Sequence, residues 1–84
     1  MTKQELKKEL SKLGLIDSDY SLNEGLKIDA MILENLDGLW RLFYYDEKGQ
    51  ESSITYHKNE SESYEYLLKT FKDQLKLLKK DTFR

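Results

Sequence analysis

IDAMILENLDGLWRLFYY, residues 28–45, decides the fold, because it holds two apolar segments joined by the dipeptide Asp37-Gly38. Asp-Gly is a favoured sequence for a two-residue type I′ turn between antiparallel strands. The sequence therefore predicts strands over about residues 28–36 and 39–46, joined by a tight hairpin.

A two-residue turn at this position also fixes which residues lie opposite each other. The expected pairs are Ala30–Tyr45, Met31–Tyr44, Ile32–Phe43, Leu33–Leu42, Glu34–Arg41 and Asn35–Trp40. Because successive side chains of a strand point to opposite faces, these pairs separate into two sets. One face is predicted to carry Met31, Leu33, Trp40, Leu42 and Tyr44. The other is predicted to carry Ile32, Phe43, Tyr45 and the Glu34–Arg41 pair.

The ion pair indicates which of the two faces is the core. Cross-strand ion pairs usually lie in or near water, so we expect the face with Trp40 to be buried. Ile54 and Tyr56 of the next strand are two residues apart, so their side chains share one face and are expected to join that core. Two alternatives stay open for Phe43 and Tyr45 on the other face: the N-terminal helix covers them, or they form an exposed patch.

The segments around the hairpin complete an α-β-β-β-α order. Thr2 and Glu5 form a capping-box pattern that predicts a helix over about 3–13, and DSDYSLNEG, residues 17–25, is typical of a loop. A turn over 47–50 precedes a third strand over 51–57. Asn59 and an apolar stripe predict a helix over about 60–80. The stripe is Tyr64, Leu67, Leu68, Phe71, Leu75 and Leu78. The predicted class is α+β, a three-stranded antiparallel meander with the C-terminal helix packed on one face.

Length and composition indicate one small domain over residues 1–84. The chain has no cysteine, which is compatible with a reducing cytosol, and its charged first residues lack the apolar run of a signal peptide. No stretch approaches the ~20 apolar residues of a membrane span. We therefore expect a cytoplasmic protein without a membrane partner.

Charge is distributed unevenly along the chain. Residues 17–66 hold twelve Asp or Glu and four Lys or Arg, a net charge of -8, whereas residues 67–84 carry a net charge of +4 from six Lys or Arg and two Asp. An acidic centre favours a cationic partner and disfavours nucleic acid, although an ordinary solvated surface can share this pattern.

Signals of catalysis are weak. His57 is the only histidine, and the four glycines each occupy an expected turn rather than a phosphate-binding loop. The expectation is a protein that is not an enzyme, with no cofactor and no metal. Lysines at 69, 72, 76 and 80 form a stripe on the last helix, which is typical of a solvated helix face and also of nucleic-acid binding.

Aromatic residues beside acids therefore point to protein binding, because Tyr and Trp are frequent interface anchors and acidic rims attract basic partners. The predicted partner-binding residues are Phe43, Tyr45, Asp46, Glu47 and Tyr20.

Four segments carry a resemblance to a known family. YSLNEGL (20–26), ILE (32–34), GLWRLFYYDEKG (38–49) and SESYEYLL (61–68) resemble small bacterial immunity proteins of polymorphic toxin systems. The resemblance spans about residues 20–68. It implies a cytosolic inhibitor that binds a cognate toxin, and it assigns no catalytic residue.

The predicted function is therefore an immunity or antitoxin-like protein that covers the basic active-site surface of a toxin. One alternative is a phage-encoded or house-keeping adaptor that forms a homodimer, for example through the strand ESSITYH (51–57). Another is a nucleic-acid binder that uses the Lys-rich C-terminal helix.

Overall fold

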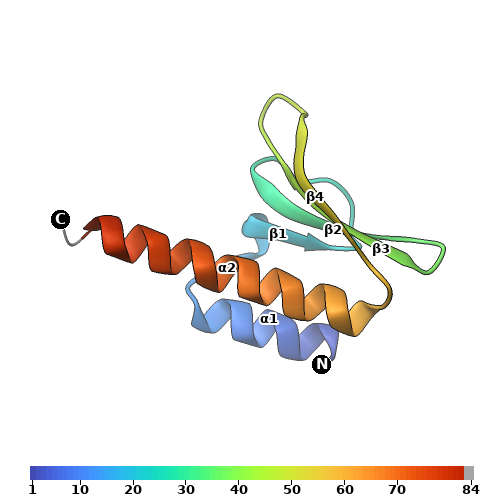
Figure 1. The fold of residues 1–84 in the computed structure, drawn as a ribbon, viewed down its shortest axis with the longest axis horizontal. Helices are drawn as coiled ribbons and strands as arrows, with labels where there is room; N and C mark the ends of the chain where they lie inside the picture. The colour runs from blue at the N-terminus through green and yellow to red at the C-terminus, as the bar shows by residue number, and fades with distance from the viewer. Residues whose placement is uncertain (83–84) are drawn as a thin grey trace.

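The computed structural model describes residues 1–82, with the side chains of residues 1–75. The elements are α1 (Lys3–Lys12), η1 (Asp17–Asp19), β1 (Tyr20–Leu22), β2 (Ala30–Leu36), β3 (Leu39–Tyr45), β4 (Glu51–His57) and α2 (Glu60–Thr82). Both helices lie side by side on the same side of the sheet (Figure 1). The α+β class and the packing of the C-terminal helix on one sheet face are as predicted.

The hairpin has the register that its turn predicts. Asp37 and Gly38 have φ values of 55° and 93°, as a type I′ turn requires, and the Gly38 N–H donates to Asn35 Oδ1 at 2.9 Å. The β2–β3 ladder then runs from the Ala30–Tyr45 pair to the Leu36–Leu39 pair, and it includes every pair expected from the sequence. β2 begins two residues later than predicted because Asp29 adopts a positive φ of 56°, which interrupts an extended strand.

β1 is a strand that sequence reasoning missed, and the prediction of a three-stranded sheet was wrong. Residues 17–25 were expected to form a loop, but Tyr20–Leu22 pairs in parallel with β2, which makes a four-stranded sheet of order β1-β2-β3-β4. Tyr20 and Leu22 alternate with Ser21 and turn toward the core. Three residues between turn-forming residues are too few for a period-2 pattern to stand out.

The core lies between the helices and the face of the sheet predicted to be buried. Met31, Leu33, Trp40 and Leu42 are buried there with Tyr44 packed against them, and the Trp40 and Tyr64 rings meet edge to face at 6.3 Å. α1 contributes Leu6 and Leu10, and α2 contributes Tyr64, Leu67, Leu68 and Phe71. Leu75 is half-buried, and the Leu78 side chain lies outside the described residues.

Both helices begin where their caps predict. The Thr2 hydroxyl accepts from the Glu5 N–H at 3.1 Å while Glu5 Oε1 accepts from the Thr2 N–H at 2.9 Å, a complete capping box. Asn59 Oδ1 accepts from the Glu62 N–H at 2.9 Å and caps the start of α2 with a single hydrogen bond.

A bulge in β4 reverses the predicted placement of Ile54 and Tyr56. Leu42 pairs with Thr55 but Tyr44 pairs with Ser52, so Ser53 and Ile54 together oppose the single residue Phe43. Ser53 absorbs the extra residue with a positive φ of 53°. As a result Tyr56 pairs with Arg41 and, with Ile54, leaves the core face for the opposite one. The expectation that they join the core was wrong.

Candidate functional site

The sheet face opposite the helices carries four large exposed side chains. Leu36 and Leu39 form the pair that closes the hairpin and are 47% and 44% exposed, and Ile54 and Tyr56 of β4 are 43% and 58% exposed. We call the surface formed by Leu36, Leu39, Ile54 and Tyr56 the open face. Contiguous exposed apolar side chains rimmed by polar groups are typical of interaction surfaces.

Three charged residues, one from each of β2, β3 and β4, lie among these side chains. Arg41 Nη2 is 3.0 Å from Glu34 Oε2, and Arg41 Nη1 is 3.1 Å from Glu51 Oε1. Glu34 lies directly opposite Arg41 in the ladder, whereas Glu51 lies opposite Tyr45, further along the sheet. The Arg41 side chain must therefore extend along the sheet to reach both carboxylates.

The position of the guanidinium explains why Phe43 is fully buried although it lies on this face. The Arg41 guanidinium carbon is 4.4 Å from the centre of the Phe43 ring, and the ring of Tyr45 meets Phe43 edge to face at 6.4 Å. Phe43, Ile32 and Ala30 form a second small core, separate from the main one. Phe43 is thus covered by its own neighbours in the sheet, and α1 belongs to the other face.

Arg41 stays positively charged in this setting. Partial burial lowers the pKa of Arg41, but its hydrogen bonds and charge interactions with Glu34 and Glu51 raise it, and the net shift is upward. Two carboxylates and one guanidinium leave the cluster with a net charge of -1. Arg41 Nε is buried and its N–H donates to no partner among the described residues, which leaves one donor of the guanidinium unused.

The remaining predicted site residues divide between the rim of the open face and the core. Tyr45 is half-buried against Phe43. Asp46 Oδ1 accepts from the backbone N–H groups of Lys48 and Gln50 at 2.9 and 2.8 Å, so this carboxylate shapes the β3–β4 turn. Glu47 is exposed at the tip of the same turn. Of the predicted patch, only Tyr45 and the two acids reach the surface.

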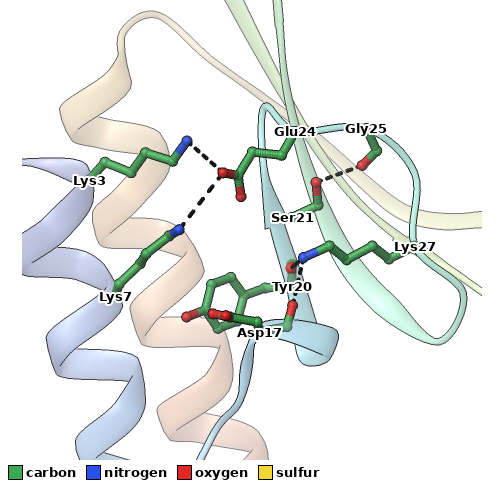
Figure 2. A network of polar contacts seen from close by, with 8 residues as sticks. All are labelled: Lys3, Lys7, Asp17, Tyr20, Ser21, Glu24, Gly25 and Lys27. Carbon is green, nitrogen blue, oxygen red and sulfur yellow. Dashed lines mark hydrogen bonds and ion pairs between the residues drawn. The ribbon is translucent and has the colours of Figure 1, made fainter.

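Tyr20 is only 4% exposed and packs in the main core, so its prediction as an exposed binding residue was wrong. Burial is the largest cause that raises the pKa of its hydroxyl, followed by the nearby carboxylate of Asp17. The Lys27 Nζ donates to the Asp17 and Tyr20 carbonyls at 2.7 and 3.0 Å, and Ser21 Oγ donates to the Gly25 carbonyl at 2.6 Å (Figure 2). These contacts hold the β1–β2 connection against β1.

Glu24 joins that connection to α1. Its Oε2 lies 3.1 Å from Lys3 Nζ and 3.8 Å from Lys7 Nζ (Figure 2). The hydrogen bond from Lys3 is the largest cause that lowers the pKa of Glu24 below 4.5. A carboxylate whose pKa is lower in the folded protein stabilises the fold above its unfolded pKa, and this contribution disappears as the pH falls through the folded value.

The urea midpoint is therefore expected to fall as the pH is lowered from 7 through the range below about 4.5. Glu24→Gln should lower the midpoint at pH 7 and reduce its dependence on acid, because its side chain stays neutral throughout. Urea titrations at several pH values measure both effects. Glu47→Gln, at an exposed turn position, is the control and should follow the wild type. If the urea midpoints of the wild type and of Glu24→Gln fell equally as the pH is lowered, this role of Glu24 would be contradicted.

Among the described residues there is no group of three or more His, Cys, Asp or Glu that could hold a metal ion, and no helix is long and apolar enough to cross a membrane. The ring of His57 packs against the ring of Tyr66, with the two ring centres 4.8 Å apart. Lys69 and Lys72 are exposed on α2, whereas the side chains of Lys76 and Lys80 lie outside the described residues.

The open face is the candidate surface whose exposed residues sequence reasoning missed. Its Ile54 and Tyr56 were assigned to the core because no glycine or asparagine marks the bulge at Ser53. The Glu34–Arg41 pair was the one signal that pointed to the correct face. Comparisons with protein-family models, curated proteins and solved structures found no match for the chain.

Proposed function

We propose that this protein is an immunity-type inhibitor that binds a basic toxin through the open face and thereby covers the active-site surface of the toxin. One observation carries the proposal: both helices pack on one side of the sheet, while Leu36, Leu39, Ile54 and Tyr56 are exposed on the other. The resemblance of residues 20–68 to immunity proteins supports a toxin as the partner.

The chemistry of the open face suits a cationic protein partner. Exposed leucine, isoleucine and tyrosine side chains supply apolar area that a partner can desolvate, and they surround a charged cluster of net charge -1. Glu47 adds a further carboxylate at the adjacent turn. The net charge of -8 over residues 17–66 would accelerate the approach of a basic surface.

The proposal changes which residues of the earlier prediction are expected to bind. Phe43 is 0% exposed, so its expected contribution to binding is indirect: its ring supports the guanidinium of Arg41. Tyr45 and Glu47 lie at the rim, and Asp46 acts through the turn that it shapes. The side chains with the largest expected contact are those of the open face.

Leu39→Lys is expected to weaken binding of the partner at least about tenfold, because it replaces an exposed apolar contact with a charge of the partner's own sign. Ile16→Lys is the matched control, since Ile16 is exposed but lies between α1 and η1, away from the open face. Isothermal titration against the purified partner measures both variants. Equal affinities for Leu39→Lys and Ile16→Lys would overturn the assignment of the open face.

The identity of the partner is tested by co-expression. The protein encoded beside this gene is expected to arrest growth when expressed alone, and to lose that effect and co-purify when this chain is present. Toxicity that persists without co-purification would overturn the immunity function. Unchanged circular dichroism of Leu39→Lys would show that any loss of rescue by that variant comes from the surface and not from unfolding.

A further inference from the structure

We propose that two copies of this chain pair through β4 as antiparallel strands, in the register that places Thr55 opposite Thr55 of the second copy. β4 is the edge strand of the sheet and is paired on one side only, with β3. An edge strand presents unpaired backbone N–H and C=O groups to another chain. The dimer requires no other protein, so it is independent of the function proposed above.

The ladder determines which backbone groups point away from the sheet. Hydrogen-bonded and non-hydrogen-bonded pairs alternate in antiparallel strands, and the Leu36–Leu39 pair that closes the two-residue turn is a hydrogen-bonded one. The N–H and C=O groups of Trp40 and Leu42 therefore turn toward β4, where they meet His57 and Thr55. The C=O of Ile54 and both backbone groups of Tyr56 consequently point outward.

Only one antiparallel register between two β4 strands uses all of these outward-pointing backbone groups. With Thr55 at the two-fold axis, Ile54 lies opposite Tyr56 of the second copy, and each Tyr56 N–H can donate to an Ile54 C=O across the interface. Ile54 and Tyr56 also share the open face, so their exposed side chains pack together across the junction. A shift toward the start of the strand would instead place the bulge at Ser53 opposite Thr55.

The charges of β4 favour the antiparallel arrangement. Residues 52–56 carry no charge, so the protection that lysine or proline gives to many edge strands is absent here. Glu51 lies at one end of the strand, and His57 and Lys58 lie at the other. Antiparallel pairing brings the acidic end of one copy to the basic end of the other, whereas parallel pairing would place like charges together.

The interface is small, because Ser53 of the bulge lies opposite His57 in this register, so regular pairing is confined to residues 54–56. Interfaces of this size belong to the weak class, so we expect a dissociation constant on the order of 100 μM. The open faces of the two copies would then form one continuous surface across both sheets.

Thr55→Cys tests the register directly. The wild type has no cysteine, and a non-hydrogen-bonded antiparallel pair holds its Cα atoms about 4.5 Å apart, within the range of a disulfide. Ser52→Cys is the matched control. In this register residue 52 lies opposite residue 58 of the second copy, so the two thiols introduced at residue 52 of the dimer would be about 20 Å apart. In a glutathione redox buffer, Thr55→Cys should form the covalent dimer at least about tenfold faster, although Thr55 is the less exposed of the two residues. Equal rates would overturn the register.

Sedimentation of the wild type tests the dimer without any substitution. The weight-average mass should rise with concentration toward that of a dimer between about 10 μM and 1 mM. Tyr56→Lys should abolish this rise, and Leu36→Lys, at an exposed position of β2, which β3 separates from β4, should leave it unchanged. A wild type that remains a monomer at about 1 mM would overturn the proposal.

Discussion

Phe43→Ala is expected to lower the free energy of unfolding by about 3–5 kcal/mol, the largest loss of any substitution on the side of the sheet that faces away from the helices. The Phe43 ring is fully buried, with the guanidinium of Arg41 over it and the ring of Tyr45 at its edge. Alanine leaves a cavity that the rigid backbone of the central strand β3 has little freedom to close. A domain of this length has a total stability of roughly 4–12 kcal/mol, so the substitution should remove at least about a quarter of it.

Urea unfolding followed by circular dichroism measures this loss. Ile54→Ala is the matched control, because Ile54 lies beside Phe43 on the same side of the sheet but is exposed, and its loss should stay below about 1 kcal/mol. A loss for Phe43→Ala as small as that of the control would mean that Phe43 is a surface residue, as the sequence alone allowed.

Leu10→Ala is expected to cost about 2–5 kcal/mol, the second largest effect. Leu10 and Leu6 are the two side chains of α1 that are fully buried, and they join the helix to the main core. The ion pairs of Lys3 and Lys7 with Glu24 are exposed and replace little of that contact. The burial of leucine is therefore the main attachment of α1.

The same unfolding measurement, with hydrogen exchange of α1 amides, tests this attachment. Gln4→Ala, at an exposed position of α1, should leave both the urea midpoint and amide protection close to the wild type. Protection of α1 in Leu10→Ala that matches the wild type would contradict the account.

The sequence was sufficient for the features that depend on local rules. Asp37-Gly38 determines a two-residue turn, and that turn determines every pair from Ala30–Tyr45 to Leu36–Leu39. The alternation of side chains then separates Trp40, Leu42 and Tyr44 from Arg41, Phe43 and Tyr45. The same local logic located the cap of α1 at Thr2 and the buried stripe of α2.

The features that sequence reasoning missed depend on contacts between distant residues. Tyr20–Leu22 becomes a strand because β2 is available beside it, which no property of three residues reveals. Ser53 takes up one extra residue, and this single irregularity moves Ile54 and Tyr56 from one side of the sheet to the other. Phe43 is buried because the long side chain of Arg41 extends over it to Glu51, a contact between residues ten positions apart. Neither alternative expected for Phe43, the first helix or an exposed patch, includes this contact with a charged neighbour.

The proposed mechanism therefore depends on a surface that appears only after folding. The open face combines the hairpin end of β2 and β3 with the part of β4 that follows the bulge. The helices contribute no side chain to it in the part of the chain with described side chains, and their role is to bury the opposite face.

Chemical-shift mapping with the purified product of the neighbouring gene tests the central claim, that the partner binds the side of the sheet that the helices leave uncovered. Addition of the partner to the ¹⁵N-labelled protein should shift or broaden the amide signals around Leu36, Leu39, Ile54 and Tyr56, and leave the exposed side of α1 unchanged. Perturbations confined to α1 and α2, with the open face unaffected, would contradict the account.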